Sequence, residues 1–148
     1  MALIESTIRT VIEVLHDGQR CYASLSGYIK DEELKTFFSD ESSHRGRYAL
    51  ELENALSTVS GKKIKEGGTA AGTVHRAWGQ VKGNLGGSDH TLLETAEQGE
   101  DAAKKAYADA LKISDIPAPI RTLLEKQKVY IHQSHNKVKA FRDSLAVA

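Results

Sequence analysis

The sequence predicts an all-α fold, and three observations lead to this prediction. Apolar residues recur at a spacing close to 3.6 over long stretches, whereas the strict alternation that is typical of a half-buried strand is absent. The only two prolines, Pro117 and Pro119, stand between two helical patterns, where they interrupt no helix interior. Glycines gather in "SGKKIKEGGTAAG" (60–72) and "GNLGGSD" (83–89), which indicates loops or caps at these places.

The chain has 148 residues, which is enough for one domain with its own core, so we take residues 1–148 as a single domain. Its formal net charge is zero, and we therefore expect neither nucleic acid nor a membrane as a partner. The single cysteine, Cys21, excludes an internal disulfide and a Cys-based zinc knuckle, and it fits a reducing compartment. No signal peptide and no apolar run of about 20 residues is found. We expect a cytoplasmic protein.

Two long helices are expected in the first part of the chain, over residues 3–29 and 31–60. At about 100° per residue, each places its apolar residues along one stripe. The first stripe comprises Ile4, Ile8, Val11, Leu15, Tyr22, Leu25 and Ile29, and the second comprises Leu34, Phe37, Tyr48, Leu52, Ala55 and Val59. Polar or small residues interrupt both stripes, namely Gly18 and Gln19 in the first and Glu41, His44 and Arg45 in the second.

A short helix with one apolar face is expected next, over residues 74–85, inside the long connection that follows. It is too small to be a principal element of the fold. Its apolar face and the residues leading into it comprise Ala71, Val74, Trp78, Val81 and Leu85.

Two further long helices complete the predicted fold. The first of them begins after a cap at Ser88 or Asp89, and the second runs from about Pro119 to Leu145. Their apolar stripes comprise Leu92, Ala96, Ala103, Tyr107 and Ala110 in the first, and Ile120, Leu124, Ile131, Val138 and Leu145 in the second. The interruptions are Gly99 and Glu100 in the first, and Gln127, Ser134 and His135 in the second.

The loop lengths predict how these helices are connected. Two hairpins with tight turns, joined by one long crossover that carries the short helix, form the ferritin-like four-helix bundle. An internal similarity supports two related hairpins. "EVLHDGQ" (13–19) matches "ETAEQGE" (94–100), and "LKTFFSDE" (34–41) matches "IRTLLEKQ" (120–127). We interpret the two hairpins as a diverged duplication.

Two segments carry a resemblance to a known family. "LLETAEQGEDAAKKAYADAL" (92–111) and "VHRAW" (74–78), together with the layout of the whole chain, resemble a bacterial family of ferritin-like four-helix-bundle proteins of unknown function. The resemblance is strongest at Gly99, Glu100 and Tyr107. It implies the fold and brings no established reaction with it.

In the wider ferritin and rubrerythrin-like superfamily, two metal ions are held at the centre of the bundle by one Glu, an ExxH pair, a second Glu and a second ExxH pair. Residues three apart share a helix face, so the carboxylate and the imidazole of such a pair can converge on one ion. Carried over to this chain, the resemblance implies Glu41 and His44 as one ExxH pair and Glu100 as a carboxylate ligand.

The other half of that metal site is missing from this sequence. Gln19 stands where the first helix should offer a carboxylate, and Gln127 and Tyr130 stand where the last helix should offer ExxH. The segment "EVLH" (13–16) also matches the ExxH motif, but Glu13 is expected opposite the apolar stripe and His16 at its flank. We therefore exclude this second pair as a ligand of the core.

A structural interpretation competes with the metal site. Glu41 would be less exposed than Glu13 and would hydrogen-bond a polar partner among His44, Gln19, Glu100 and Gln127, because buried polar groups need partners. A layer of this kind can fix helix register without any chemistry. The side chains assigned to this layer, or to the surroundings of a metal, are Gln19, Glu97, Tyr107, Gln127 and His135.

Three classes of function remain open. The first, which we favour, is a non-catalytic structural, stress-related or interaction protein. If it forms a homo-oligomer, side chains such as Val14, Leu50 and Val129 would make the contacts between copies. The second binds one divalent ion of iron, zinc or manganese at Glu41, His44 and Glu100, with water completing the shell. The third is a di-iron oxidoreductase. No catalytic residue is assigned, and no cofactor is required by the first class.

Overall fold

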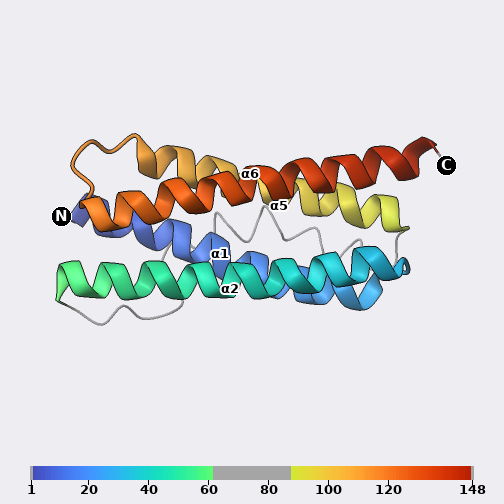
Figure 1. Ribbon diagram of the computed structural model, residues 1–148, viewed down its shortest axis with the longest axis horizontal. Coiled ribbons are helices and arrows are strands. Elements are labelled where there is room, and N and C mark those ends of the chain that lie inside the picture. Colours follow the sequence, from blue (N-terminus) through green and yellow to red (C-terminus); the bar gives the residue numbers. More distant parts are fainter. Residues whose placement is uncertain (1, 62–87, 148) are drawn as a thin grey trace.

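The computed structural model describes residues 2–61 and 88–147, and within them it contains four long α-helices and no strand. These helices form an elongated bundle (Figure 1). The helices are α1 (Ala2–Tyr28), α2 (Glu32–Ser60), α5 (Asp89–Leu111) and α6 (Ala118–Val147). The predicted all-α four-helix bundle is confirmed. The short helix predicted over residues 74–85 lies outside the described residues.

Local chemistry explains where the helices begin and end. The side chain of Asp31 accepts a hydrogen bond of 3.0 Å from the Leu34 amide at the start of α2. Ser88 caps α5 in the same way, since its hydroxyl accepts from the Thr91 amide at 3.2 Å. At the end of α2, Gly61 has φ 70° and donates its N–H to a carbonyl of the last turn. A left-handed residue of this kind is favourable only for glycine.

The two hairpins pack side by side, so that the first helix of each lies against the first helix of the other (Figure 1). Within each hairpin the helices are antiparallel, whereas α2 and α5 run in the same direction. A single long crossover therefore has to lead from the end of α2 back to the start of α5. At that start, Asp89 accepts hydrogen bonds from the backbone amides of Lys30 (2.9 Å) and Asp31 (3.1 Å). This contact ties the beginning of α5 to the turn between α1 and α2.

The apolar core consists of two clusters, one toward each end of the bundle. Both contain most of the residues of the predicted stripes, and both take residues from all four helices. In α2 the buried residues differ from the prediction, because Phe38 and Leu56 are fully buried whereas Phe37, Ala55 and Val59 are only partly buried. The larger cluster contains Ile8, Leu15, Leu52, Leu56, Tyr107 and Leu124 among others, and the smaller contains Tyr22, Leu25, Phe38, Leu92 and Val138 among others. Buried polar side chains at the middle of α2, α5 and α6 belong to neither cluster.

The middle of α1 differs from the expectation. Glu13 and Asp17 are only 6% and 5% exposed, and Val14 is buried as well. Glu13 was expected opposite the apolar stripe, but this position is not exposed: every residue over 11–18 is buried except the partly buried His16, and no side of the helix faces solvent there. Glu41 is 3% exposed and Glu13 is 6% exposed, so Glu41 is less exposed, as expected, but only slightly.

Two other expectations about the surface can be compared with the structure. Val14 cannot provide a contact on the outside, whereas Leu50 and Val129 are 55% and 59% exposed. Among the described residues, no helix combines the length and the apolar character that crossing a membrane requires.

A buried ion network as the candidate functional site

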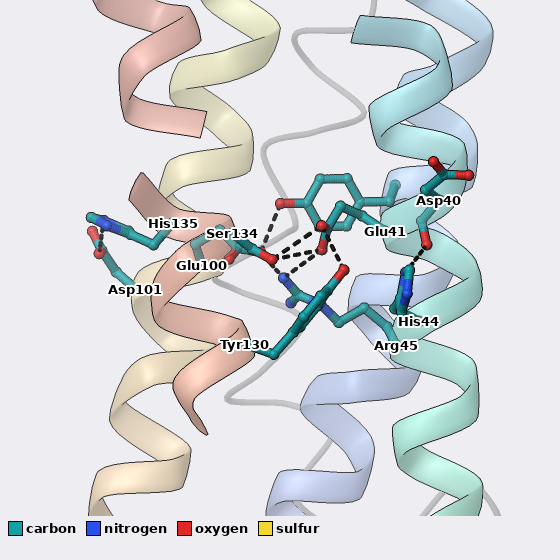
Figure 2. A network of polar contacts seen from close by, with 10 residues as sticks. Asp40, Glu41, His44, Arg45, Glu100, Asp101, Tyr130, Ser134 and His135 are labelled. Atoms are coloured by element: carbon teal, nitrogen blue, oxygen red, sulfur yellow. Dashed lines mark hydrogen bonds and ion pairs between the residues drawn. The ribbon is translucent and has the colours of Figure 1, made fainter. Parts of the chain in front are cut away.

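The centre of the polar layer is an arginine. Arg45 lies on α2, one turn after Glu41, so both side chains point to the same side of the helix. Its Nη2 atom donates to Glu41 Oε2 at 3.2 Å and also to Glu100 Oε1 on α5. All three side chains are almost completely buried, with at most 4% of any of them exposed. One guanidinium therefore holds two carboxyl groups together in the interior (Figure 2).

The helix α1 contributes an aromatic partner to this network. The Tyr22 hydroxyl donates to Glu100 Oε1 at 2.7 Å, and the Arg45 guanidinium lies over the Tyr22 ring, 5.3 Å from its centroid. One turn earlier, Gly18 faces the Arg45 side chain: a Cβ added there would lie 3.6 Å from Cγ and Nη1 of Arg45. The absence of a side chain at Gly18 leaves space beside the guanidinium.

The helix α6 completes the network on the other side of Glu41. The Ser134 hydroxyl lies 3.0 Å from both carboxyl oxygens of Glu41, and the Tyr130 hydroxyl donates to Oε1 at 2.8 Å. Contacts from all four helices thus meet in one continuous set of hydrogen bonds (Figure 2). The partners of Glu41 are Arg45, Tyr130 and Ser134, so the expectation of a partner among His44, Gln19, Glu100 and Gln127 is wrong.

The electrostatics of the network follow from its burial. Burial raises the pKa of Glu100, while Arg45 and the hydrogen bond from Tyr22 act in the opposite direction. Burial is the largest single influence on Arg45 and would lower its pKa, but its neighbours together, Glu100 first among them, outweigh burial, and the pKa is raised. Burial also raises the pKa of Tyr22 well above its ordinary value, so its hydroxyl remains a neutral donor. Arg45 is consequently a permanent positive charge in the core.

The structure brings Glu41 and Glu100 together and leaves His44 outside. The Nδ1–H of His44 donates to the Asp40 carbonyl on its own helix at 2.8 Å, and its ring packs 4.9 Å from the Tyr130 ring. In Figure 2 this ring lies along α2, away from Glu100. Within residues 2–61 and 88–147, no group of three or more His, Cys, Asp or Glu side chains is arranged to hold a metal ion.

As they are placed, the residues fit a guanidinium better than a metal ion. Both carboxyl groups are already bonded to Arg45, and a dication between them would lie against that positive charge. A metal site at Glu41, His44 and Glu100 would require Arg45 to leave and the His44 ring to turn. Metal binding by the three side chains stays a prediction.

A second set of buried hydrogen bonds surrounds Gln127. The Tyr107 hydroxyl donates to Gln127 Oε1 at 2.7 Å. The amide nitrogen of Gln127 donates to the Tyr48 carbonyl at 3.4 Å and to Glu51 Oε1 at 3.2 Å. Both hydrogen-bonding ends of the Gln127 amide are therefore engaged, and they join α6 to α5 and to α2.

Gln19 has a packing role between α1 and α2. Its side chain lies directly over Gly46, where an added Cβ would come within 2.5 Å of the Gln19 amide nitrogen. Its backbone carbonyl accepts from the Ser42 hydroxyl at 2.7 Å. The two helices approach closely here because Gly46 has no side chain. Gln19 makes no hydrogen bond to Glu41 or Glu100 in the part of the chain that the structure describes.

Glu97 and His135 belong to a separate cluster near the surface between α5 and α6. His135 Nε2 lies 3.0 Å from Asp101 Oδ1 and 3.9 Å from Glu97 Oε1. Glu97 is also paired with Arg142. Figure 2 shows His135 and Asp101 on the far side of α6 and α5 from Arg45. These residues surround no part of the central network.

Sequence reasoning recognised the polar positions but missed the residue at their centre. Arg45 was treated only as an interruption of the apolar stripe, although a Glu and an Arg four residues apart commonly pair on a helix. Tyr22 could not be found by its pattern, because a tyrosine fits an apolar stripe as well as phenylalanine does. Tyr130 stands where a second ExxH pair would offer histidine, but this position does not reveal its hydrogen bond to Glu41. A further pair was missed between His16 Nε2 and Glu53 Oε1, which lie 2.6 Å apart on α1 and α2.

These features define an all-α four-helix bundle whose helices are joined by a buried ion network. A comparison with protein families matches residues 4–113 to the family described as domain of unknown function (DUF2383), and the chain belongs to this family. The match includes Tyr22, Glu41, Arg45 and Glu100, whereas α6 follows it. No curated protein matches the chain.

Proposed function

We propose that this protein is a non-catalytic structural or interaction protein with the ferritin-like arrangement of helices, in which Arg45 takes the position of the metal ions. The observation that carries this proposal is the contact of a single nitrogen, Nη2 of Arg45, with carboxyl groups on two different helices. The guanidinium supplies a fixed positive charge with several donors, which is what the two carboxyl groups would otherwise take from a cation.

The chemistry of the guanidinium supports a structural role. It does not change oxidation state, it offers no open ligand position, and it does not release its proton at the pH of a cell. Because the network links all four helices, it favours one arrangement of the two hairpins over others, which is a role established for some buried polar groups. A cytoplasmic location agrees with the presence of a single cysteine and is part of the same proposal.

The interaction part of the proposal rests on the exposed apolar side chains. Leu50 on α2 and Val129 on α6 are each more than half exposed. Exposed apolar groups favour association with another surface when they are covered together. A homo-oligomer or a partner protein would both satisfy this requirement.

A second candidate function is the binding of one divalent ion. It is favoured by the convergence of Glu41 and Glu100, which already share one cationic nitrogen and so lie within reach of a single cation. Zinc, iron or manganese would accept two carboxylates, the imidazole of His44 and water. A di-iron centre has less support, because Gln19 and Gln127 supply no negative charge to balance a second ion.

Elemental analysis of protein purified without chelator distinguishes these functions. The proposed function predicts that the protein retains no divalent ion in stoichiometric amount. One ion per chain that is lost in Glu41→Ala and in Glu100→Ala, but retained in Glu97→Gln, would establish the second candidate instead. Two tightly held irons per chain with rapid oxidation of ferrous iron would establish the di-iron enzyme.

A further inference from the structure

Three polar atoms of the central network have no hydrogen-bond partner among the described residues. They are Nε and Nη1 of Arg45 and Oε2 of Glu100, and all three are buried. Nη2 of Arg45 and Oε1 of Glu100 make the hydrogen bonds of these two groups with each other, with Tyr22 and with Glu41. A buried donor or acceptor without a partner is costly, and native proteins satisfy nearly all such groups.

We propose that an internal water molecule binds between Arg45 and Glu100. It accepts a hydrogen bond from the free N–H groups of the guanidinium and donates one to Oε2 of Glu100. The site calls for a ligand that is small and neutral and that both donates and accepts. An anion would be repelled by Glu41 and Glu100, and a metal ion would be repelled by Arg45. Water alone meets these conditions at this size, and buried waters usually serve such orphaned groups.

Gly18 forms the wall of this site on α1. A Cβ at this position would lie 3.6 Å from Arg45 Cγ and Nη1, which is ordinary van der Waals contact. The protein atoms by themselves therefore leave room for alanine. A methyl group there would nevertheless contact Nη1, and we expect it to displace a water molecule bound to this atom. The glycine is thus explained by the water and not by a clash with protein atoms.

If this water is present, Gly18→Ala should destabilise the protein, which is unusual for a glycine-to-alanine change in a helix. Replacing a helical glycine by alanine normally stabilises a protein, since alanine loses less backbone freedom on folding. Gly27, on the same helix, has no atom within 4 Å of its added Cβ and serves as the matched control. We expect Gly27→Ala to raise the midpoint of thermal unfolding and Gly18→Ala to lower it. Gly18→Ser should recover part of the loss, because its hydroxyl can replace the water as an acceptor for Nη1.

A crystal structure of the full chain decides the proposal directly, at a resolution that shows other buried waters. The expected result is one ordered water within hydrogen-bond distance of Glu100 Oε2 and of Arg45 Nε or Nη1, absent from Gly18→Ala. Wild-type density without this water overturns the proposal whatever the variants do, as does a Gly18→Ala protein that is stabilised like Gly27→Ala. If Gly18→Ala does not fold, the wild-type density alone gives the answer.

This inference rests on the proposed function, because it requires Arg45 to remain between the carboxyl groups. The two fail in different ways. A metal ion found at Glu41 and Glu100, with Arg45 displaced, contradicts the proposed function. An intact Arg45 network without the water contradicts only the hydration site.

Discussion

Two arginines in this bundle make similar contacts in very different surroundings. Arg45 bonds to Glu41 and Glu100, and Arg142 bonds to Glu97 and Asp143. The side chain of Arg45 is 1% exposed, whereas that of Arg142 is 26% exposed and its partner Asp143 is 58% exposed. A list of ion pairs would give the two arginines the same importance.

The difference teaches that burial decides what an ion pair does for the fold. Around Arg142, water replaces a lost partner, and side-chain freedom and salt weaken the attraction. Bulk solvent has no access to Arg45, so the loss of one partner leaves a charge in the core without compensation.

The largest effect is expected for Arg45→Met. Methionine fills much of the same volume but leaves the carboxyl groups of Glu41 and Glu100 buried without their cation. Removing one partner of a buried pair costs on the order of 3–5 kcal/mol, which is a large share of the roughly 5–15 kcal/mol that stabilises a typical domain. Urea unfolding followed by circular dichroism measures this loss.

A triple variant tests whether the uncompensated carboxyl groups cause this loss of stability. Adding Glu41→Leu and Glu100→Leu to Arg45→Met removes the uncompensated groups and should recover much of the lost free energy of unfolding, because an apolar replacement of a whole buried network is often tolerated. If Arg45→Met cost no more than Arg142→Met, the guanidinium would not be essential to the core. The difference in burial between the two arginines would then have no effect on the free energy of unfolding.

A smaller loss is expected for variants of Glu41. Glu41→Ala leaves a cavity together with orphaned hydroxyls at Tyr130 and Ser134, and it should cost about 2–4 kcal/mol. Glu41→Leu should cost less, since it fills the volume and leaves Arg45 paired with Glu100. Equal losses for alanine and leucine, again from urea unfolding, would show that the volume at this position is unimportant and that only the carboxyl group matters.

The two tyrosines at the edges of the network allow a finer comparison. Tyr22 is fully buried and Tyr130 is partly exposed, and each donates to one of the carboxyl groups. Tyr22→Phe should cost about 1.5–3 kcal/mol, as expected for a buried hydrogen bond to a charged group. Tyr130→Phe should cost less, because Tyr130 is itself partly exposed and Glu41 keeps its hydrogen bonds from Arg45 and Ser134. The reverse order, measured by thermal unfolding, would contradict the difference in burial.

The fold was predictable from the sequence because it depends on a repeated pattern. The stripes with a period of 3.6, the cap at Ser88 and the prolines around the start of α6 each act within a few residues, and they predict all four described helices to within about two residues. The middle of α1 could not be predicted in this way. A helical wheel assumes one face toward solvent, and around Glu13 and Asp17 the helix has none.

The candidate site was only partly predictable, for a physical reason. Sequence spacing shows that Glu41, Arg45 and Glu100 point inward, but it does not show which of them meet. That depends on rotation and register between α2 and α5, which tertiary packing fixes. His44 illustrates the limit: three residues after Glu41 it shares roughly the same face, yet its ring bonds back to the Asp40 carbonyl and packs on Tyr130.

The smallest effect is expected for Arg142→Met, which is the matched control for Arg45→Met. The change removes the pairing with Glu97 and Asp143, but both carboxylates keep access to water and need no replacement partner. Glu97 also retains His135 at 3.9 Å. We expect a change in the free energy of unfolding close to the error of a urea titration. Any difference from wild type should shrink further when salt is added, because exposed charges are screened. A large loss that is insensitive to salt would mean that the pair of Glu97 and Arg142 is buried in solution, and the contrast between the two arginines would disappear.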